Sequence, residues 1–372
     1  MRTRLTLLQP VERAAAALRR GEPVLIDGAS GGAILALAGE TARAGQLEAL
    51  RALGAPVHAV LTHARAQTLK IRLYTEGVVA LDLPESGAME RLRALIDPTA
   101  DLANPLVGPY QALRITLPEA YGPGVKLAKL AGLLPALVAT SVSEATAHAI
   151  EDRDRLERLS AADIAAYDET AARSLKAVTQ ARVPLAGAEH SEIVAFRASD
   201  GGPEHLAILI GDRDGNPPAP PGPVLARLHS ECFTGDLIGS LKCDCGDQLR
   251  GAIRAIAEGG GGVLLYLAQE GRGIGLMNKL RAYHLQDQGF DTIEANERLG
   301  FDADERLFLP AATMLQILGF TAVRLLTNNP DKVASLERHG IHITERVAHA
   351  FPSNPYNADY LQTKKAKAGH VL

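Results

Sequence analysis

The chain has 372 residues, of which 47% are hydrophobic and 22% charged, and its formal net charge is −4. This composition is ordinary for a globular protein, and the length favours two domains. The absence of tryptophan, an aromatic content of 4% and the negative charge argue against nucleic acid as a partner, so an anionic ligand would need local basic residues.

The sequence also carries no sign of secretion or of membrane insertion. Its first residues have no apolar signal region, and no segment approaches the roughly 20 apolar residues that span a bilayer. Three cysteines cannot complete a disulfide framework. We therefore expect a cytoplasmic protein with no membrane partner.

The first block, residues 1–178, alternates helical and strand-like patterns. Residues 10–28 predict a helix, a turn and a strand, and residues 55–71 predict a strand followed by a helix. Residues 125–142 repeat this logic as a helix and then a strand. A long polar helix over residues 161–181 is expected to connect this block to the next.

The second block, residues 179–372, predicts an α/β domain whose sheet is at least partly parallel. Its last predicted helix has the clearest end signals: Asn329 can cap it, Pro330 suits the first helical position and Gly340 suits the exit. The fold class is thus α/β with two domains. Strands are expected at 192–198, 205–212, 224–230, 262–269 and 322–327, and helices at 248–260 and 328–341.

All three cysteines lie within fourteen positions, as Cys232, Cys243 and Cys245. Thiolates at this spacing can converge on one soft cation, most commonly zinc in a cytoplasmic protein. Three protein ligands leave a position open for water, as in catalytic sites, whereas His229 as a fourth ligand would complete a structural site. Buried structural cysteines are the other reading, and the nearby acidic residues argue against it. Spacing leaves catalytic and structural zinc both open.

Six segments together resemble GTP cyclohydrolase II, the zinc enzyme that opens riboflavin synthesis. The resemblance implies that the three cysteines bind one Zn²⁺ per subunit and that water completes the shell, which favours the catalytic reading. The segments are RLHSECFTGD (227–236), SLKCDCGDQL (240–249), YLAQEGRGIGLMNKLRAY (266–283), DTIEANERLGFDADER (291–306), RLLTNNPDKV (324–333) and NPYNADYLQTKKAKAGH (354–370).

The resemblance implies hydrolysis of GTP to 2,5-diamino-6-(5-phosphoribosylamino)pyrimidin-4(3H)-one, with release of formate and pyrophosphate. Asp304 matches the family's proton acceptor, and Tyr283 matches a tyrosine near the zinc-bound water. Arg306 matches the residue proposed to attack the α-phosphorus, but a guanidinium is a poor nucleophile and more commonly stabilises phosphoryl charge. The resemblance also implies Mg²⁺ with the triphosphate and a homodimer.

The family's GTP contacts fall on matching residue types throughout. Taken singly, most of them have ordinary readings as strand, turn or surface residues, and their joint occurrence in order carries the assignment. Lys332 lies where helix-terminal amides and a cation would together favour phosphate. The implied contacts are Arg227, Leu228, His229, Ser230, Glu231, Gln248, Glu270, Gly271, Arg272, Thr292, Thr327 and Lys332.

The first block resembles the 3,4-dihydroxy-2-butanone 4-phosphate (DHBP) synthase domain that is often fused ahead of this cyclohydrolase. That synthase has an acidic, magnesium-binding loop after its first strand, whereas residues 27–32 here read DGASGG. Its histidine–threonine–glutamate motif aligns with Ala120, Tyr121 and Gly122. Without those carboxylates the block is expected to fold but not to catalyse, and its His58 and His63 are expected to be ordinary core or surface residues.

Two alternatives remain beside the cyclohydrolase. A divergent relative could open another nucleotide or nucleobase, but the phosphate-side residues Arg306, Thr327 and Lys332 speak against it. A GTP-sensing scaffold would need neither Asp304 nor an open zinc site. The sequence does not indicate what the first block now does.

Overall fold

The computed structural model describes residues 5–102, 108–212, 214–218, 222–352 and 355–356. Most of the terminal resemblance segment, 354–370, lies outside these residues. The chain forms two compact units: unit 1 comprises Met1–Asp168 and Met277–Glu305, and unit 2 comprises Glu169–Leu276 and Arg306–Leu372. These units are defined by contacts between residues and are discontinuous in the sequence. The two sequence domains, 1–178 and 179–372, stay a prediction. Among the described residues, no helix is long and apolar enough to cross a membrane.

Unit 1 is built on a six-stranded mixed sheet in the order β4-β3-β5-β2-β1-β6, in which only β1 and β6 pair in parallel. Its strands are β1 (Val24–Asp27), β2 (Ala33–Ala38), β3 (Val57–Thr62), β4 (Val78–Asp82), β5 (Ala136–Val142) and β6 (Glu157–Ser160). Its helices are α1 (Leu5–Arg20), α2 (Ala44–Arg51), α3 (His63–Thr68), α4 (Ala88–Ile96), η1 (Pro98–Ala100), α5 (Tyr121–Leu130), α6 (Glu144–Asp154) and α10 (Thr292–Arg298), together with nearly all of α9 (Gly275–Asp287).

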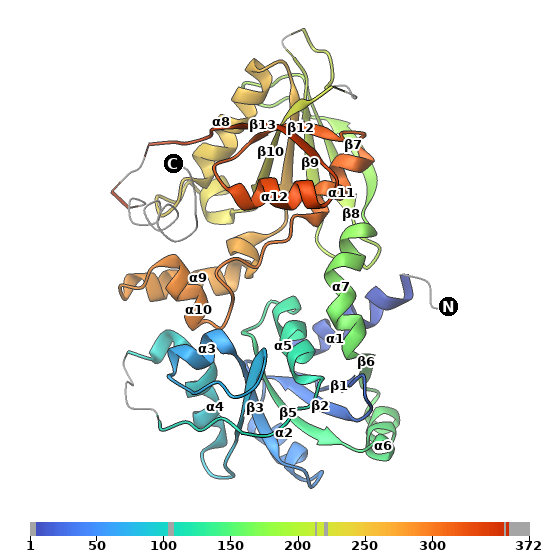
Figure 1. Cartoon of the computed structure of the whole chain (residues 1–372), viewed down its shortest axis with the longest axis vertical. Helices are drawn as coiled ribbons and strands as arrows, with labels where there is room; N and C mark the ends of the chain where they lie inside the picture. Colours follow the sequence, from blue (N-terminus) through green and yellow to red (C-terminus); the bar gives the residue numbers. More distant parts are fainter. Residues whose placement is uncertain (1–4, 103–107, 213, 219–221, 353–354, 357–372) are drawn as a thin grey trace. The chain divides into compact units, whose positions relative to one another are not determined.

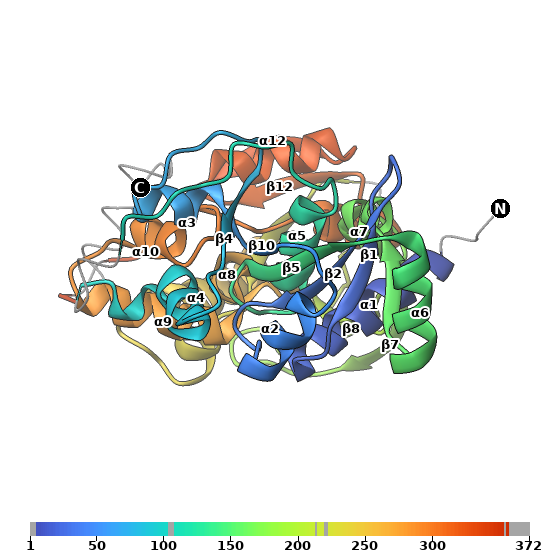
Figure 2. The same ribbon diagram turned by 90° about the horizontal axis from the view of Figure 1, so that it is seen from below.

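Alternation along the strands gives the sheet of unit 1 two buried faces. Leu25 and Leu35 pack with Leu47 of α2 and Leu92 of α4 in one hydrophobic cluster. On the other face α5 approaches closely, since a Cβ on its Gly124 would meet the side chains of Leu137, Ile26 and Ile34. Figures 1 and 2 also show α10 beside α3 within this unit. The elements predicted at 10–28, 55–71 and 125–142 are all present.

Unit 2 contains a seven-stranded sheet in the order β13-β12-β10-β11-β9-β8-β7. The four strands β13, β12, β10 and β11 run parallel, and β9, β8 and β7 continue antiparallel, so the predicted mixed sheet is confirmed. The strands are β7 (Lys176–Arg182), β8 (Ser191–Arg197), β9 (His205–Ile210), β10 (Val224–Ser230), β11 (Gly262–Leu267), β12 (Ala322–Leu326) and β13 (His342–Val347).

Helices cover both faces of this second sheet (Figure 1). Leu225 and Leu264 face α8 (Cys245–Glu258), whereas Ala226 and Val263 face α11 (Leu309–Ile317) and α12 (Pro330–Arg338). The expected signals at α12 are confirmed, since the Asn329 side chain accepts from Asp331 N at 2.8 Å and Pro330 is the first helical residue.

The predicted helix over residues 161–181 is wrong in its second half. The helix α7 (Ala161–Arg173) ends at Arg173, and the following residues form β7 against β8. Val178 and Thr179 are β-branched, which favours extended backbone, and β8 offers an edge whose amides need partners. Tertiary pairing therefore overrides the helical pattern.

Candidate metal centre and nucleotide site

The predicted site residues of unit 2 gather at the carboxyl edge of three parallel strands. Ser230 ends β10, Glu270 follows β11 and Thr327 follows β12. Because these strands are hydrogen-bonded in parallel, with Ser230 opposite Leu267, the loops that leave them emerge at the same edge. This edge is where open α/β sheets bind their ligands.

The three cysteines converge at this edge. Cys232 lies two residues after the end of β10 and immediately before η2 (Phe233–Leu237), a π-type turn, while Cys245 is the first residue of α8. The three sulfur atoms lie within 4.8 Å of one another, and the Cys232 and Cys243 sulfurs are 3.7 Å apart. Zinc–sulfur bonds of about 2.3 Å at tetrahedral angles place two sulfurs roughly 3.8 Å apart. The donor set therefore fits a tetrahedral ion with three thiolate ligands.

The space between the sulfurs depends on a glycine. A Cβ on Gly235 would lie 2.8 Å from the Cys243 sulfur, 3.0 Å from the Cys232 sulfur and 2.9 Å from the Cys245 Cβ. Its backbone amide also donates to the Cys232 sulfur at 3.3 Å. Gly235 thus lets the backbone approach all three cysteines while leaving room between them.

The thiols influence one another's titration. The contact with Cys232, together with burial, raises the pKa of Cys243 to about 11. Contacts with Cys232 and Cys243, together with burial, raise the pKa of Cys245 well above its ordinary value. Thiolates this close repel one another, so a bound cation is what would hold all three deprotonated at neutral pH.

A buried carboxylate supports the loop that carries Cys232. Both carboxylate oxygens of Asp236 lie 3.0 Å from His229 Nε2, and one of them accepts from the Cys232 backbone amide at 3.0 Å. The Tyr266 hydroxyl donates to the same carboxylate at 2.9 Å, and its ring stacks on His229. Burial lowers the pKa of His229, although Asp236 opposes this shift.

This arrangement bears on the structural-zinc alternative. His229 Nε2 is engaged with Asp236, and the group among the described residues that could hold a metal ion consists of the three cysteines. His229 therefore acts here as a partner of Asp236. The geometry favours a three-thiolate site over a four-ligand structural one.

Arg227 heads a buried polar chain beside the cysteines. It donates to Leu326 O at 2.9 Å and to Gln248 Oε1 at 2.5 Å, and Gln248 donates in turn to Asp244 at 2.5 Å. Burial lowers the pKa of Arg227 to about 10, so it stays cationic at neutral pH. Within the described part of the chain, its Nε and the Ser230 hydroxyl are buried with no hydrogen-bond partner. Such atoms in a native fold are candidate ligand contacts.

The Glu270–Arg272 turn has unusual backbone geometry. Gly271 and Arg272 both have a φ of 63°, and this left-handed conformation is uncommon for a residue with a side chain such as arginine. The turn is held by Glu270, whose carboxylate accepts from Phe233 N at 2.6 Å and from Gly271 N at 3.0 Å. Glu270 thereby ties the loop after β11 to the cysteine loop after β10.

The phosphate-side residues of unit 2 lie by α12 and α11. Lys332 is buried and donates to Leu228 O at 2.8 Å, and its Nζ lies 5.6 Å from the centre of the Phe308 ring. Arg306 approaches the same ring at 5.6 Å. The Thr327 hydroxyl accepts from Asn329 N at 3.0 Å, so it also serves the turn that caps α12. Glu231 begins the loop after β10, and its amide donates to Leu267 O.

Three predicted residues belong to unit 1 and are described with that unit. Tyr283 lies on α9, where the Lys279 ammonium is 5.7 Å from its ring centre. Thr292 is the first residue of α10, and its hydroxyl accepts from Gln286 at 3.1 Å. Asp304 is exposed in the coil after α10.

In the loop at residues 27–32, Asp27 and Ser30 are hydrogen-bonded to other residues of the first block. Asp27 forms a bidentate ion pair with Arg158 at 2.9–3.0 Å, and Ser30 N donates to Glu119. His58 is buried against the Tyr121 hydroxyl at 2.8 Å, and His63 bonds to a backbone carbonyl. Both histidines have ordinary structural partners, as expected.

Sequence reasoning gave no role to Asp236 or Tyr266. Asp236 stands among the acidic residues beside the cysteines, which was a usable signal, but its donors come from two segments, 229–232 and β11. His349 was also missed. Its ring bonds to Gln248 O at 2.9 Å, and its backbone makes two hydrogen bonds to the Asn328 side chain.

Comparison with known proteins identifies relatives of the whole chain and of its second half. A family model described as GTP cyclohydrolase II matches residues 176–348. A protein of Azospirillum brasilense named GTP cyclohydrolase-2 is 51% identical over 370 residues, which cover 98% of this chain and 94% of the relative. A protein of the same name from Escherichia fergusonii is 54% identical over 198 residues, which cover 53% of this chain and 97% of the relative.

Two solved structures resemble the fold more distantly. A two-domain DHBP synthase from A. baumannii is 18% identical with a TM-score of 0.38, and covers 85% of this chain and 93% of that one. The DHBP synthase of Candida albicans is 18% identical with a TM-score of 0.32, and covers 43% of this chain and 97% of that one. At these scores the two likenesses support no assignment for the first block.

Proposed function

This chain belongs to the GTP cyclohydrolase II family, and we propose that it hydrolyses GTP to the 2,5-diamino-pyrimidinone ribosylamine phosphate, formate and pyrophosphate, the first step of riboflavin biosynthesis. The observation that carries the proposal is the three-thiolate cluster at the carboxyl edge of β10 and β11 beside the buried cation of Arg227. A homodimer is part of the proposal and rests on the resemblance alone, and a cytoplasmic location is proposed from the sequence features given above.

We propose Zn²⁺ as the ion held by Cys232, Cys243 and Cys245, one per chain. Three thiolates in a partly buried cluster suit a borderline-soft cation with an open coordination position. When bound there, zinc would supply Lewis-acid activation of water at neutral pH. Asp236 would hold Cys232 through its backbone amide and orient His229.

The residues of the chain divide the remaining work between the base and the phosphates. On the base side, Gln248 and Arg227 would orient the purine through groups already fixed by Asp244 and Leu326. On the phosphate side, Lys332 and Arg306 would bind the triphosphate with Mg²⁺, Arg306 by stabilising charge rather than as a nucleophile. Asp304 would accept a proton, and Tyr283 would donate a hydrogen bond during ring opening. The remaining contacts proposed are Leu228, His229, Ser230, Glu231, Glu270, Gly271, Arg272, Thr292 and Thr327.

The proposed activity is tested with purified, zinc-loaded protein, GTP and Mg²⁺, by measuring formate and pyrophosphate together. Equal amounts of the two products are expected from GTP, and none from ATP or after zinc is removed by chelation. GTP binding without formate would contradict the enzyme and support the GTP-sensing scaffold instead.

Replacing Asp236 with asparagine is expected to weaken zinc binding or turnover by about 10- to 100-fold, the usual effect of losing an outer-shell carboxylate. The amide offers one acceptor oxygen where the carboxylate serves His229, Tyr266 and the Cys232 amide. Zinc affinity by competition with a chromogenic chelator and formate release measure the effect. Asp247→Asn is the matched control, because Asp247 is exposed and forms an ion pair with Arg250 on the same helix. Equal behaviour of the two variants would contradict the role given to Asp236.

A further inference from the structure

The second-block segment Met277–Glu305 belongs by its contacts to unit 1. It lies inside the stretch that matches the cyclohydrolase family, yet it packs with residues of the first block. It carries Tyr283, Thr292 and Asp304, three of the residues assigned above to the reaction. What holds this segment therefore bears on the position of those three side chains.

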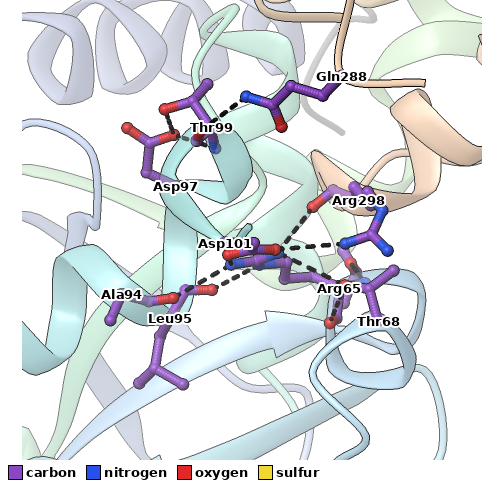
Figure 3. A network of polar contacts seen from close by, with 10 residues as sticks. Arg65, Thr68, Ala94, Leu95, Asp97, Thr99, Asp101, Gln288 and Arg298 are labelled. Carbon is purple, nitrogen blue, oxygen red and sulfur yellow. Dashed lines mark hydrogen bonds and ion pairs between the residues drawn. The ribbon is translucent and has the colours of Figure 1, made fainter. Parts of the chain in front are cut away.

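The most buried of its contacts centres on Arg65 (Figure 3). The Arg65 side chain is 2% exposed and forms a bidentate ion pair with Asp101 at 2.6 and 2.9 Å. It also donates to Leu95 O at 2.7 Å and to Arg298 O at the end of α10 at 3.4 Å. The Arg298 guanidinium lies 3.6 Å from the same Asp101 carboxylate. The Asp101 carboxylate thus pairs with two arginines, Arg65 of the first block and Arg298 of the 277–305 segment.

The backbone after α10 lies directly against the first block. The Thr62 hydroxyl donates to Gly300 O at 2.8 Å. Gly300 has a φ of +89°, and a Cβ there would lie 2.9 Å from Pro135 and 3.1 Å from the Thr62 hydroxyl. Only glycine combines this backbone conformation with this close approach.

Helix α9 is held by a second ion pair. Arg281 donates to both oxygens of Glu40, at 2.5 and 3.2 Å, and Glu40 also accepts from Leu134 N at 2.8 Å. Asn278, which is fully buried, donates to Gly132 O at 3.2 Å and accepts from Arg281 at 2.7 Å. The polar groups on this side of α9 are thus bound by the first block.

The third contact flanks Asp304 itself. Lys129 of α5 donates to Glu305 at 2.6 Å and lies 3.4 Å from the Asp302 carboxylate. The Glu305 carboxylate in turn accepts from Asp302 N at 2.7 Å, so the two ends of the 302–305 turn are hydrogen-bonded to each other. Asp304 lies in the sequence between Asp302 and Glu305, the two residues whose carboxylates Lys129 contacts.

From these contacts we infer that the first block is a positioning scaffold for the 277–305 segment, with Lys129 as the positioning residue for Asp304. The inference rests on the proposed function. Catalytic side chains must be held within a fraction of an ångström, and a loop achieves this only through fixed partners. Here those partners are Glu40, Thr62, Arg65, Asp101 and Lys129, none of which the reaction itself uses.

Lys129→Met tests the inference without emptying a buried site. Its ion pairs are partly exposed, and such pairs contribute little to folding stability, whereas removing a partner of the buried Arg65 pair would risk the fold. We expect kcat for formate release to fall about 5- to 50-fold, with KM for GTP within about twofold and zinc content unchanged. Lys129→Arg, which keeps the charge, should restore most of the rate.

Lys126→Met is the matched control, because Lys126 lies on the same helix and pairs with Asp168, outside the segment. It should behave as wild type. A wild-type kcat in Lys129→Met, or the same loss in Lys126→Met, would overturn the inference.

Hydrogen exchange adds a readout that needs no activity: amides of residues 299–306 should exchange faster in Lys129→Met, and those of α2 should not. Unaltered exchange would overturn the inference even if the wild-type protein released no formate, an outcome that would separately refute the proposed function.

Discussion

Cys243→Ser is expected to abolish formate release from GTP, lowering the rate by about a thousandfold or more, equivalent to roughly 4 kcal/mol of transition-state stabilisation. A serine hydroxyl is not deprotonated at neutral pH and is a poor ligand for a borderline-soft cation. Two thiolates would remain where the geometry provides three, with sulfurs within 4.8 Å of one another. Zinc content should therefore fall below about a tenth of the wild-type value.

Elemental analysis of the purified variant and a formate assay check this expectation. Leu241→Ser is the control. Leu241 is 56% exposed and lies two positions before Cys243, so this variant introduces a serine nearby while all three cysteines remain. It should retain both zinc and activity. Full zinc content and turnover in Cys243→Ser would show that the ion, if needed at all, is held elsewhere.

Gly235→Ala is expected to lower zinc binding at least about tenfold and formate release about a hundredfold, although every thiol remains. The added Cβ would lie within 3.0 Å of the sulfurs of Cys232 and Cys243, in the space that the ion and its open coordination position require. Expelling the methyl group would demand that the turn after β10 move, and the contact of Gly235 O with Gly246 leaves little room, since a Cβ there would be 2.4 Å away.

A thiol titration of the denatured protein should give the same count for wild type and Gly235→Ala, so that any loss of zinc reflects geometry and not ligand number. Gly222→Ala serves as the matched control, because a Cβ at Gly222 meets nothing within 4 Å. Wild-type zinc affinity in Gly235→Ala would mean that the three sulfurs do not surround the ion as the structure places them.

The sequence predicted those parts of the site that depend on local pattern. The sequence around two features is enough to recognise them: Cys232 lies two residues after β10, and Asn329 is followed by Pro330 at the start of α12. Residues 176–181 were missed as a strand because β7 depends on pairing with β8 rather than on its own periodicity.

The supporting contacts could not be predicted in this way, because they join distant segments. Asp236 binds donors on β10 and β11, and nothing in the sequence pairs it with Tyr266. Arg65 and Arg298 are separated by 233 positions and meet only in the folded chain. The 277–305 segment groups with the first block because of its contacts in the folded chain, although in the sequence it lies within the second block.

The ion pairs and buried side chains of that segment also limit how this protein can be divided. A fragment beginning at residue 179 would retain Arg281 and Arg298 but lose Glu40 and Asp101, their counter-charges. It would also uncover Phe301, which is 1% exposed in the intact chain. Newly exposed apolar surface of this kind promotes aggregation. In this chain the two blocks are therefore not interchangeable modules.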